Sequence, residues 1–111
     1  MERFIQRFGN RALERFLSES EIALVKNHKT ASGFWAAKEA CSKALGVGIG
    51  AECGFHDIVI YKTPNGAPKL QLTQKILQKF AISDISLSIT HDGEYAIAVV
   101  AIESPSANKI K

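Results

Sequence analysis

Glu39 and Lys43 are the side chains in this sequence whose types and spacing most clearly suggest chemistry. They stand four residues apart within segment 33–46, which reads Gly-Phe-Trp-Ala-Ala-Lys-Glu-Ala-Cys-Ser-Lys-Ala-Leu-Gly. On a helix, this spacing places a carboxylate and an ammonium group one turn apart on one face. One interpretation is an ordinary surface ion pair that contributes about 0.2–0.5 kcal/mol to helix stability. The other is a phosphate site, in which the carboxylate holds a hard divalent cation and the lysine adds a second positive charge.

The segment that carries this pair is expected to form one helix. Ala, Leu, Lys and Glu favour helices, and Gly46 stands where helices commonly end in a left-handed residue. Phe34, Ala37 and Cys41 recur at three- and four-residue spacing and therefore form an apolar face. The opposite face is expected to carry the tryptophan and the polar side chains, namely Trp35, Lys38, Glu39, Ser42 and Lys43.

Length and composition indicate one domain that spans residues 1–111. The chain has 111 residues, of which 46% are hydrophobic, and a net charge of +3. No apolar run is long enough to cross a bilayer and no signal-peptide pattern is present, so we expect a cytoplasmic protein without a membrane partner. The mild positive charge favours anionic partners, but no nucleic-acid motif accompanies it, so we do not expect nucleic acid among them. Cys41 is expected to be a small buried hydrophobe.

The order of the remaining elements predicts the α+β class, with helices first and two β-hairpins later. Ser18 and Glu21 form a capping-box pattern before a helix that is expected to run to about Lys26. Residues 27–32 are interpreted as a polar linker, and the tail 104–111 as disordered. The later elements are expected to be a strand at 55–62, a turn at 63–66, a strand at 69–72, a helix at 74–80 capped by Thr73, and a hairpin of 85–90 and 94–102 joined at Asp92-Gly93.

Segment 35–48 resembles the signature helix of holo-acyl-carrier-protein synthases, which are phosphopantetheinyl transferases. The likeness extends from about residue 3 to about residue 103. Four later segments resemble parts of the same family in the same order: Phe-His-Asp-Ile at 55–58 its following strand, Asn-Gly-Ala-Pro at 65–68 its glycine-proline turn, Ser-Ile-Thr-His at 88–91 the end of a late strand, and 95–100 its closing strand.

The resemblance implies a fold, an assembly and a reaction. The fold is the α+β phosphopantetheinyl-transferase fold, with helices packed on a small antiparallel sheet, in a homotrimer with active sites between subunits. The reaction moves phosphopantetheine from coenzyme A to a serine of apo-acyl carrier protein, with Mg²⁺, in fatty-acid biosynthesis. Glu39 matches the family's metal ligand and Lys43 the lysine beside the phosphates, so both become catalytic candidates. The serine would attack the β-phosphorus in line, and either a metal-bound water or Glu39 acting through water would remove its proton.

The resemblance also suggests which residues contact coenzyme A. Lys38 is interpreted either as a surface cation or as a neighbour of the phosphates. The other candidates, besides Lys43, lie in the glycine-proline turn and the late strand: Asn65, Gly66, Ser88, Thr90 and His91. Each has a plainer alternative, since a tight turn explains the Asn-Gly pair and a single strand-end His is often only hydrogen-bonded or exposed.

Arginines near the start of the chain suggest a docking surface for an acidic partner. The family docks the acidic helix of its carrier protein against arginines of its first helix, and the matching residues are Arg3, Arg7 and Arg11. The alternative is an ordinary solvated helix face. Docking through charge predicts an interaction that weakens with salt.

The sequence departs from the family pattern at three points. The family's first strand, whose Asp is the other metal carboxylate, would precede the matching region, and we interpret this as a missing start. Phe34 replaces a frequent Arg and Ala67 a frequent Lys, for which Lys29 or Lys62 are candidate substitutes. The missing Asp keeps open a second hypothesis, a non-catalytic module that binds coenzyme A or the carrier; a third is a basic nucleic-acid-binding domain.

Overall fold

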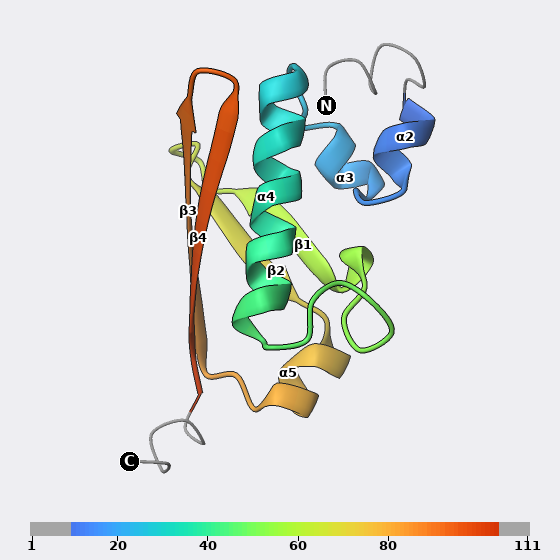
Figure 1. Cartoon of the computed structure of the whole chain (residues 1–111), viewed down its shortest axis with the longest axis vertical. Helices are drawn as coiled ribbons and strands as arrows, with labels where there is room; N and C mark the ends of the chain where they lie inside the picture. Colours follow the sequence, from blue (N-terminus) through green and yellow to red (C-terminus); the bar gives the residue numbers. More distant parts are fainter. Residues whose placement is uncertain (1–9, 105–111) are drawn as a thin grey trace.

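Helix α4 (His28–Ala44) lies in the middle of the molecule, with a long β-hairpin on one side and the first helices on the other (Figure 1). The structure is a computed structural model and describes residues 10–104. The predicted tail lies outside this range except for Ser104, whose hydroxyl donates to the Ala81 carbonyl oxygen at 3.1 Å. The other elements are α2 (Asn10–Glu14), α3 (Glu19–Ile22), the 3-10 turn η1 (Phe55–Asp57), β1 (Ile58–Lys62), β2 (Pro68–Leu72), α5 (Gln74–Phe80), β3 (Asp84–Asp92) and β4 (Tyr95–Glu103).

The strands form two separate antiparallel hairpins. Strand β1 pairs with β2 from Ile58–Leu72 to Lys62–Pro68, and β3 pairs with β4 from Asp84–Glu103 to Asp92–Tyr95. Strands β2 and β3 are neighbours but share no ladder, so the expected small sheet is in fact two two-stranded sheets. The predicted α+β class is confirmed.

Glycines with positive φ end the long helix and form both hairpin turns. Gly46 has φ +85° just after α4, where the helix end was predicted. Gly66 and Gly93 have φ +85° and +61° at the β1–β2 and β3–β4 turns, both of which were also predicted. A side chain at any of these positions would strain the backbone.

Helix α4 begins earlier than the sequence patterns predicted. The Asn27 side chain accepts hydrogen bonds from the backbone N–H groups of Lys29 (2.9 Å) and Thr30 (3.1 Å), which makes Asn27 the N-cap. The interpretation of residues 27–32 as a polar linker is therefore wrong, because one capping side chain turns most of that segment into the first helical turns.

Helix α3 is shorter than predicted, ending at Ile22 and not near Lys26. The capping box of Ser18 and Glu21 is present, as expected. Beyond it, Leu24 and Val25 both pack against the core although they are adjacent in the sequence. The backbone N–H groups of Leu24 and Val25 donate to the carbonyls of Glu21 and Ile22, three residues earlier, so the chain continues in tight turns and not as an α-helix.

Thr73 occupies the N-cap position of α5 but its hydroxyl does not cap the helix. It donates instead to Asp57 Oδ1 at 3.0 Å, while Asp57 Oδ2 accepts from Lys75 at 3.1 Å. Partial burial acts to raise the pKa of Asp57, but hydrogen bonds from the Gly54 N–H, Lys75 and Thr73 lower it below the ordinary value. This cluster ties η1 to the start of α5.

The core lies between α4, the β1–β2 hairpin and the first two helices. Inner side chains of β3 and β4 are half-buried against it, while the alternate side chains of both strands face outward, exposed. The described residues include no helix with the length and hydropathy needed to span a bilayer. The buried apolar residues of the core cluster are Leu13, Phe16, Leu17, Ala31, Phe34, Ala37, Cys41, Cys53, Ile58, Ile60, Leu70, Leu72 and Ile76.

Candidate active site

Glu39 and Lys43 lie together along an open groove between α4 and β4. The groove has a volume of about 620 Å³. Alanines of both α4 and β4 line the groove, and their small side chains leave it open. Its full lining is Trp35, Ala36, Glu39, Ala40 and Lys43 from α4, and Ala96, Ile97 and Ala98 from β4.

The Glu39 carboxylate is available to a cation. Among residues 10–104, the ion pairs join other side chains, and Glu39 takes part in none of them. Within the same range, no three His, Cys, Asp or Glu side chains gather closely enough to form a metal cage. Magnesium needs only one or two protein carboxylates when phosphate oxygens and waters complete its shell, so a single carboxylate in an open groove suits it.

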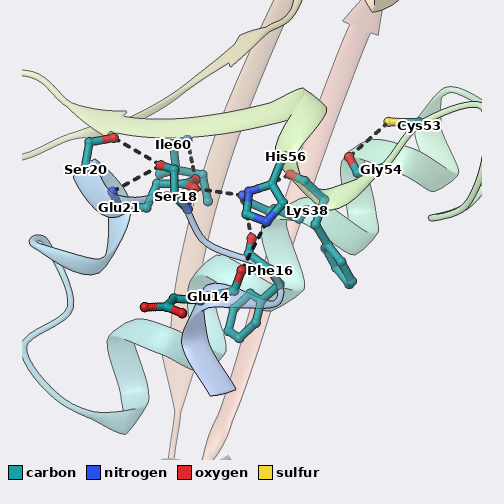
Figure 2. Close-up of polar contacts among 11 residues, drawn as sticks. Glu14, Phe16, Ser18, Ser20, Glu21, Lys38, Cys53, Gly54, His56 and Ile60 are labelled. Atoms are coloured by element: carbon teal, nitrogen blue, oxygen red, sulfur yellow. Dashed lines mark hydrogen bonds and ion pairs between the residues drawn. The ribbon is translucent and has the colours of Figure 1, made fainter. Parts of the chain in front are cut away.

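Lys38 is buried, which corrects both interpretations offered for it. Its side chain is inaccessible to solvent. Its Nζ donates to three oxygen atoms: the Phe16 carbonyl at 2.7 Å and Glu21 Oε1 at 2.9 Å (Figure 2), and the Phe55 carbonyl at 3.0 Å. An ammonium group has three donors, so none is left for a phosphate. Burial lowers the pKa of Lys38, while the hydrogen bond and charge of Glu21 oppose that shift.

Two further side chains of α4 are buried beside the site. Ser42 was expected on the polar face, but it is buried and its hydroxyl donates to the Glu39 carbonyl oxygen at 2.8 Å. Cys41 is buried, as predicted, and burial together with the nearby Cys53 raises its pKa to about 12. Its thiol is therefore a packing group and not a nucleophile at neutral pH.

A second hollow lies on the β3 side of α4. It has a volume of about 170 Å³, and it brings together His91 from β3 and Gly66 from the β1–β2 turn, two of the predicted coenzyme-binding residues. Lys62, one of the proposed substitutes for a missing cation, also lines it. The remaining lining residues are Thr30, Gly33, Phe34, Pro68 and Ile89.

Gly33 lets α4 approach the His91 ring, a role that the sequence analysis missed. A Cβ atom at this position would lie 3.1 Å from Ile89 Cγ2 and 3.3 Å from His91 Cε1. The available signal was a glycine inside a helical pattern, which costs helix stability and often has a packing reason.

The other predicted coenzyme contacts are not gathered in this hollow. Ser88 and Thr90 alternate with Ile89 and His91 along β3, so they point to the opposite, exposed face of the hairpin. Asn65 is exposed at the turn next to Gly66. Within one chain, the residues of the Ser-Ile-Thr-His segment therefore divide between two faces.

The predicted docking arginines fall only partly within the described residues. Arg11 lies on α2 and is exposed. Arg3 and Arg7 lie outside residues 10–104. An exposed arginine on the first described helix is compatible with an acidic partner, and the docking surface stays a prediction.

The comparisons place the chain in a known class of enzymes. Residues 1–100 match the profile of the 4'-phosphopantetheinyl transferase superfamily. The chain therefore belongs to the 4'-phosphopantetheinyl transferase superfamily, which confirms the family assignment made from the motifs.

Its relatives within that superfamily are holo-[acyl-carrier-protein] synthases. The protein of that name from Sulfurimonas denitrificans is 73% identical over 99% of this chain and 91% of its own length. The one from Wolinella succinogenes is 57% identical over 96% and 91%. Among solved structures, the Helicobacter pylori holo-[acyl-carrier-protein] synthase in complex with coenzyme A aligns with a TM-score of 0.88 and 48% identity, covering 92% of this chain and 90% of that one.

Replacing Gly33 by Ala should destabilise the protein in spite of the better helix propensity of Ala. Ala gains about 1 kcal/mol within a helix, but crowding against Ile89 and His91 costs about 1–3 kcal/mol. We therefore expect a lower thermal midpoint and a changed environment of the His91 ring, measured by calorimetry and NMR. Gly50→Ala is the matched control, since its Cβ would meet nothing within 4 Å. A Gly33→Ala variant more stable than the wild type would contradict this packing.

Proposed function

We propose that this chain transfers phosphopantetheine from coenzyme A to a serine of an apo-acyl carrier protein, in the cytoplasm, as a step of fatty-acid biosynthesis. The observation that carries the proposal is the pair of Glu39 and Lys43 in one open groove of a chain from this superfamily. The relatives named as holo-[acyl-carrier-protein] synthases and the solved neighbour with bound coenzyme A support the same substrates.

Glu39 would hold the divalent cation, which we propose to be Mg²⁺. When bound, such an ion polarises the diphosphate and neutralises its charge. Glu39 suits this role because its carboxylate has no ion-pair partner among the described residues and faces open space. No group of three His, Cys, Asp or Glu side chains that could hold a metal ion forms within residues 10–104, so Glu39 is the one protein ligand that we propose for the ion.

Lys43 would stabilise the negative charge that develops as the serine attacks the β-phosphorus and adenosine bisphosphate leaves. It is exposed on the groove one helical turn after Glu39, so both side chains reach the same space. The groove positions the two reacting groups, and fixed positive charge is most effective where charge appears in the transition state.

The nucleotide end of coenzyme A would bind at the β3 side of α4. His91, Gly66 and Lys62 line the hollow there. We propose that Lys62 supplies the positive charge that the family takes from the arginine replaced here by Phe34, because Phe34 is buried and apolar while the Lys62 side chain is exposed at the rim. Asn65, next to Gly66, would lie beside the same nucleotide.

The outer face of the β3–β4 hairpin supports assembly with other chains, which we propose to be the homotrimer that the family resemblance implies. Tyr95, Ile97 and Val99 are 78%, 53% and 61% exposed, an apolar row that a single chain leaves uncovered. Ser88 and Thr90 lie on the same face, opposite Val99 and Ile97 in the strand register. In a trimer this face would be buried, and Ser88 and Thr90 would contact coenzyme A held by the neighbouring subunit.

Replacing Glu39 by Gln should reduce transfer by about 100-fold or more, since it removes the carboxylate charge without changing the size of the side chain. The measurement is the mass shift of apo-carrier protein incubated with coenzyme A and Mg²⁺. Glu52→Gln, at an exposed glutamate paired with Lys79 at 3.7 Å, is the matched control and should transfer like the wild type. Full transfer by Glu39→Gln would refute the metal assignment. Binding of coenzyme A by a wild-type chain that transfers nothing would favour the non-catalytic binding module.

Replacing Arg3, Arg7 and Arg11 by Ala should raise the KM for the carrier about fivefold or more and leave the KM for coenzyme A unchanged. The effect should shrink at high salt, where the wild type also loses charge attraction. Steady-state kinetics at two ionic strengths measure both quantities, with Lys79→Ala as a control that removes one positive charge from α5. Equal increases of the two KM values would refute the docking role.

Replacing Val99 by Lys should convert the trimer to single chains, because it places a charge in the apolar row. Sedimentation equilibrium measures the mass directly. Gln71→Lys, on the exposed side of β2, adds the same side chain elsewhere and should keep the wild-type mass. A wild-type chain that sediments as a monomer at micromolar concentration would contradict the proposed assembly.

A further inference from the structure

One buried lysine ties α4 to three other segments of the chain. Lys38 Nζ lies within 3.0 Å of the Phe16 carbonyl oxygen just after α2 and of Glu21 Oε1 in α3 (Figure 2), and also of the Phe55 carbonyl oxygen in η1. The Lys38 and Glu21 side chains are both fully buried. We call the Lys38 ammonium, the Glu21 carboxylate and the Phe16 and Phe55 carbonyls the Lys38 clasp.

Both oxygens of the Glu21 carboxylate accept hydrogen bonds, just as all three donors of the Lys38 ammonium are occupied. Glu21 Oε1 also accepts from the Ser18 N–H at 2.7 Å, and Glu21 Oε2 accepts from the Ile60 N–H at 2.8 Å. A capping box requires only the first of these bonds. The bonds to Lys38 and Ile60 go beyond capping, because they connect α3 to α4 on one side and to β1 on the other.

The clasp specifies geometry more than it adds stability. A buried ion pair stabilises little compared with apolar side chains of the same volume, because both charges must leave water. Its hydrogen bonds, however, demand defined distances and directions. A saturated network of this kind, with no unpartnered buried side-chain polar atom among the described residues, therefore holds α4 in one position.

The two residues whose carbonyls accept from Lys38 also support Trp35, a residue that lines the groove. Phe16 and Phe55 bind Lys38 through their carbonyls, and their rings pack on Trp35 with centroid distances of 5.1 Å and 5.0 Å. Trp35 lies one helical turn before Lys38 and lines the groove with Glu39. Movement of either carbonyl would therefore move the ring that supports the groove wall.

We propose that Lys38 and Glu21 are positioning residues for phosphopantetheine transfer: by holding the Phe16 and Phe55 carbonyls, Lys38 sets the place of Trp35 and Glu39 in the groove. This inference rests on the proposed function, because that function places the transfer of phosphopantetheine in the groove. Lys38 acts without touching a substrate, since it is buried and its donors are all occupied. Misplacing a reacting group by about 1 Å can cost about 100-fold in rate.

The experiment replaces the clasp by neutral side chains of similar size, in the double variant Glu21→Gln with Lys38→Met. This removes both charges together, so no buried charge is left without a partner. The matched control, Glu52→Gln with Lys79→Met, makes the same two substitutions at an exposed ion pair. Thermal unfolding shows that each variant is folded at the assay temperature.

Two readouts separate positioning from stability. The first is kcat for transfer at saturating coenzyme A and carrier, which should fall about tenfold or more in the folded double variant and stay unchanged in the control. The second is acrylamide quenching of Trp35, the only tryptophan in the sequence, which reports on the groove wall without any substrate. Quenching should increase in the double variant and not in the control.

A folded double variant with wild-type kcat would overturn the proposal, and so would a loss of kcat without any change in Trp35 quenching.

If the double variant does not fold, the single variant Lys38→Arg is tested with the same two readouts. Arginine keeps the charge and the donors but is longer and planar, so it must displace the carbonyls. We expect lower kcat and increased quenching, and an Arg variant with wild-type kcat would overturn the proposal. A wild-type chain without transfer refutes the function instead, while the quenching result still tests the clasp.

Discussion

The arrangement of this protein depends on a charged pair in its interior, Lys38 with Glu21. The pair lies where α2, α3, η1 and β1 meet the long helix, and each of its polar atoms has a partner. Removing one member of such a pair leaves an uncompensated charge and costs about 3–5 kcal/mol, a large part of the stability of a small domain. The helix that carries Glu39 and Lys43 is thus tied by hydrogen bonds of Lys38 to three other segments of the chain.

That helix has a different task on each of its sides. Toward the core it buries mainly small and apolar side chains together with Lys38 and Ser42, and on its groove side it presents Glu39 and Lys43 between alanines that leave room for a ligand. Near its start, Gly33 allows β3 to come close enough for His91 to form the second hollow. Two hollows along one helix suit a long substrate with a charged diphosphate and a nucleotide end, which is the shape of coenzyme A.

Much of the fold was predictable because its signals are local. The capping box of Ser18 and Glu21, the glycine after α4 and the two hairpin turns each depend on residues close together in the sequence. The motif around Glu39 and Lys43 identified the family for the same reason. These features require no knowledge of how distant segments pack.

The features that were missed depend on contacts between distant segments. Lys38 follows a polar pattern on its helix, but its carboxylate partner lies 17 residues earlier, and no rule of helix spacing reveals that pairing. The resemblance named Ser88, Thr90 and His91 together as coenzyme contacts, but only the fold shows which strand face meets α4, with Ser88 and Thr90 on the outer face of the hairpin, where their role stays a prediction. Which face of a strand meets the core is known only once the partner of that face is known.

The most direct test of the proposed site is a crystal structure of the chain with coenzyme A and Mg²⁺. We expect the diphosphate in the groove beside Lys43, an ion bound to the Glu39 carboxylate, and the nucleotide at the hollow lined by Gly66 and His91. A diphosphate bound away from α4, with no ion at Glu39, would contradict it.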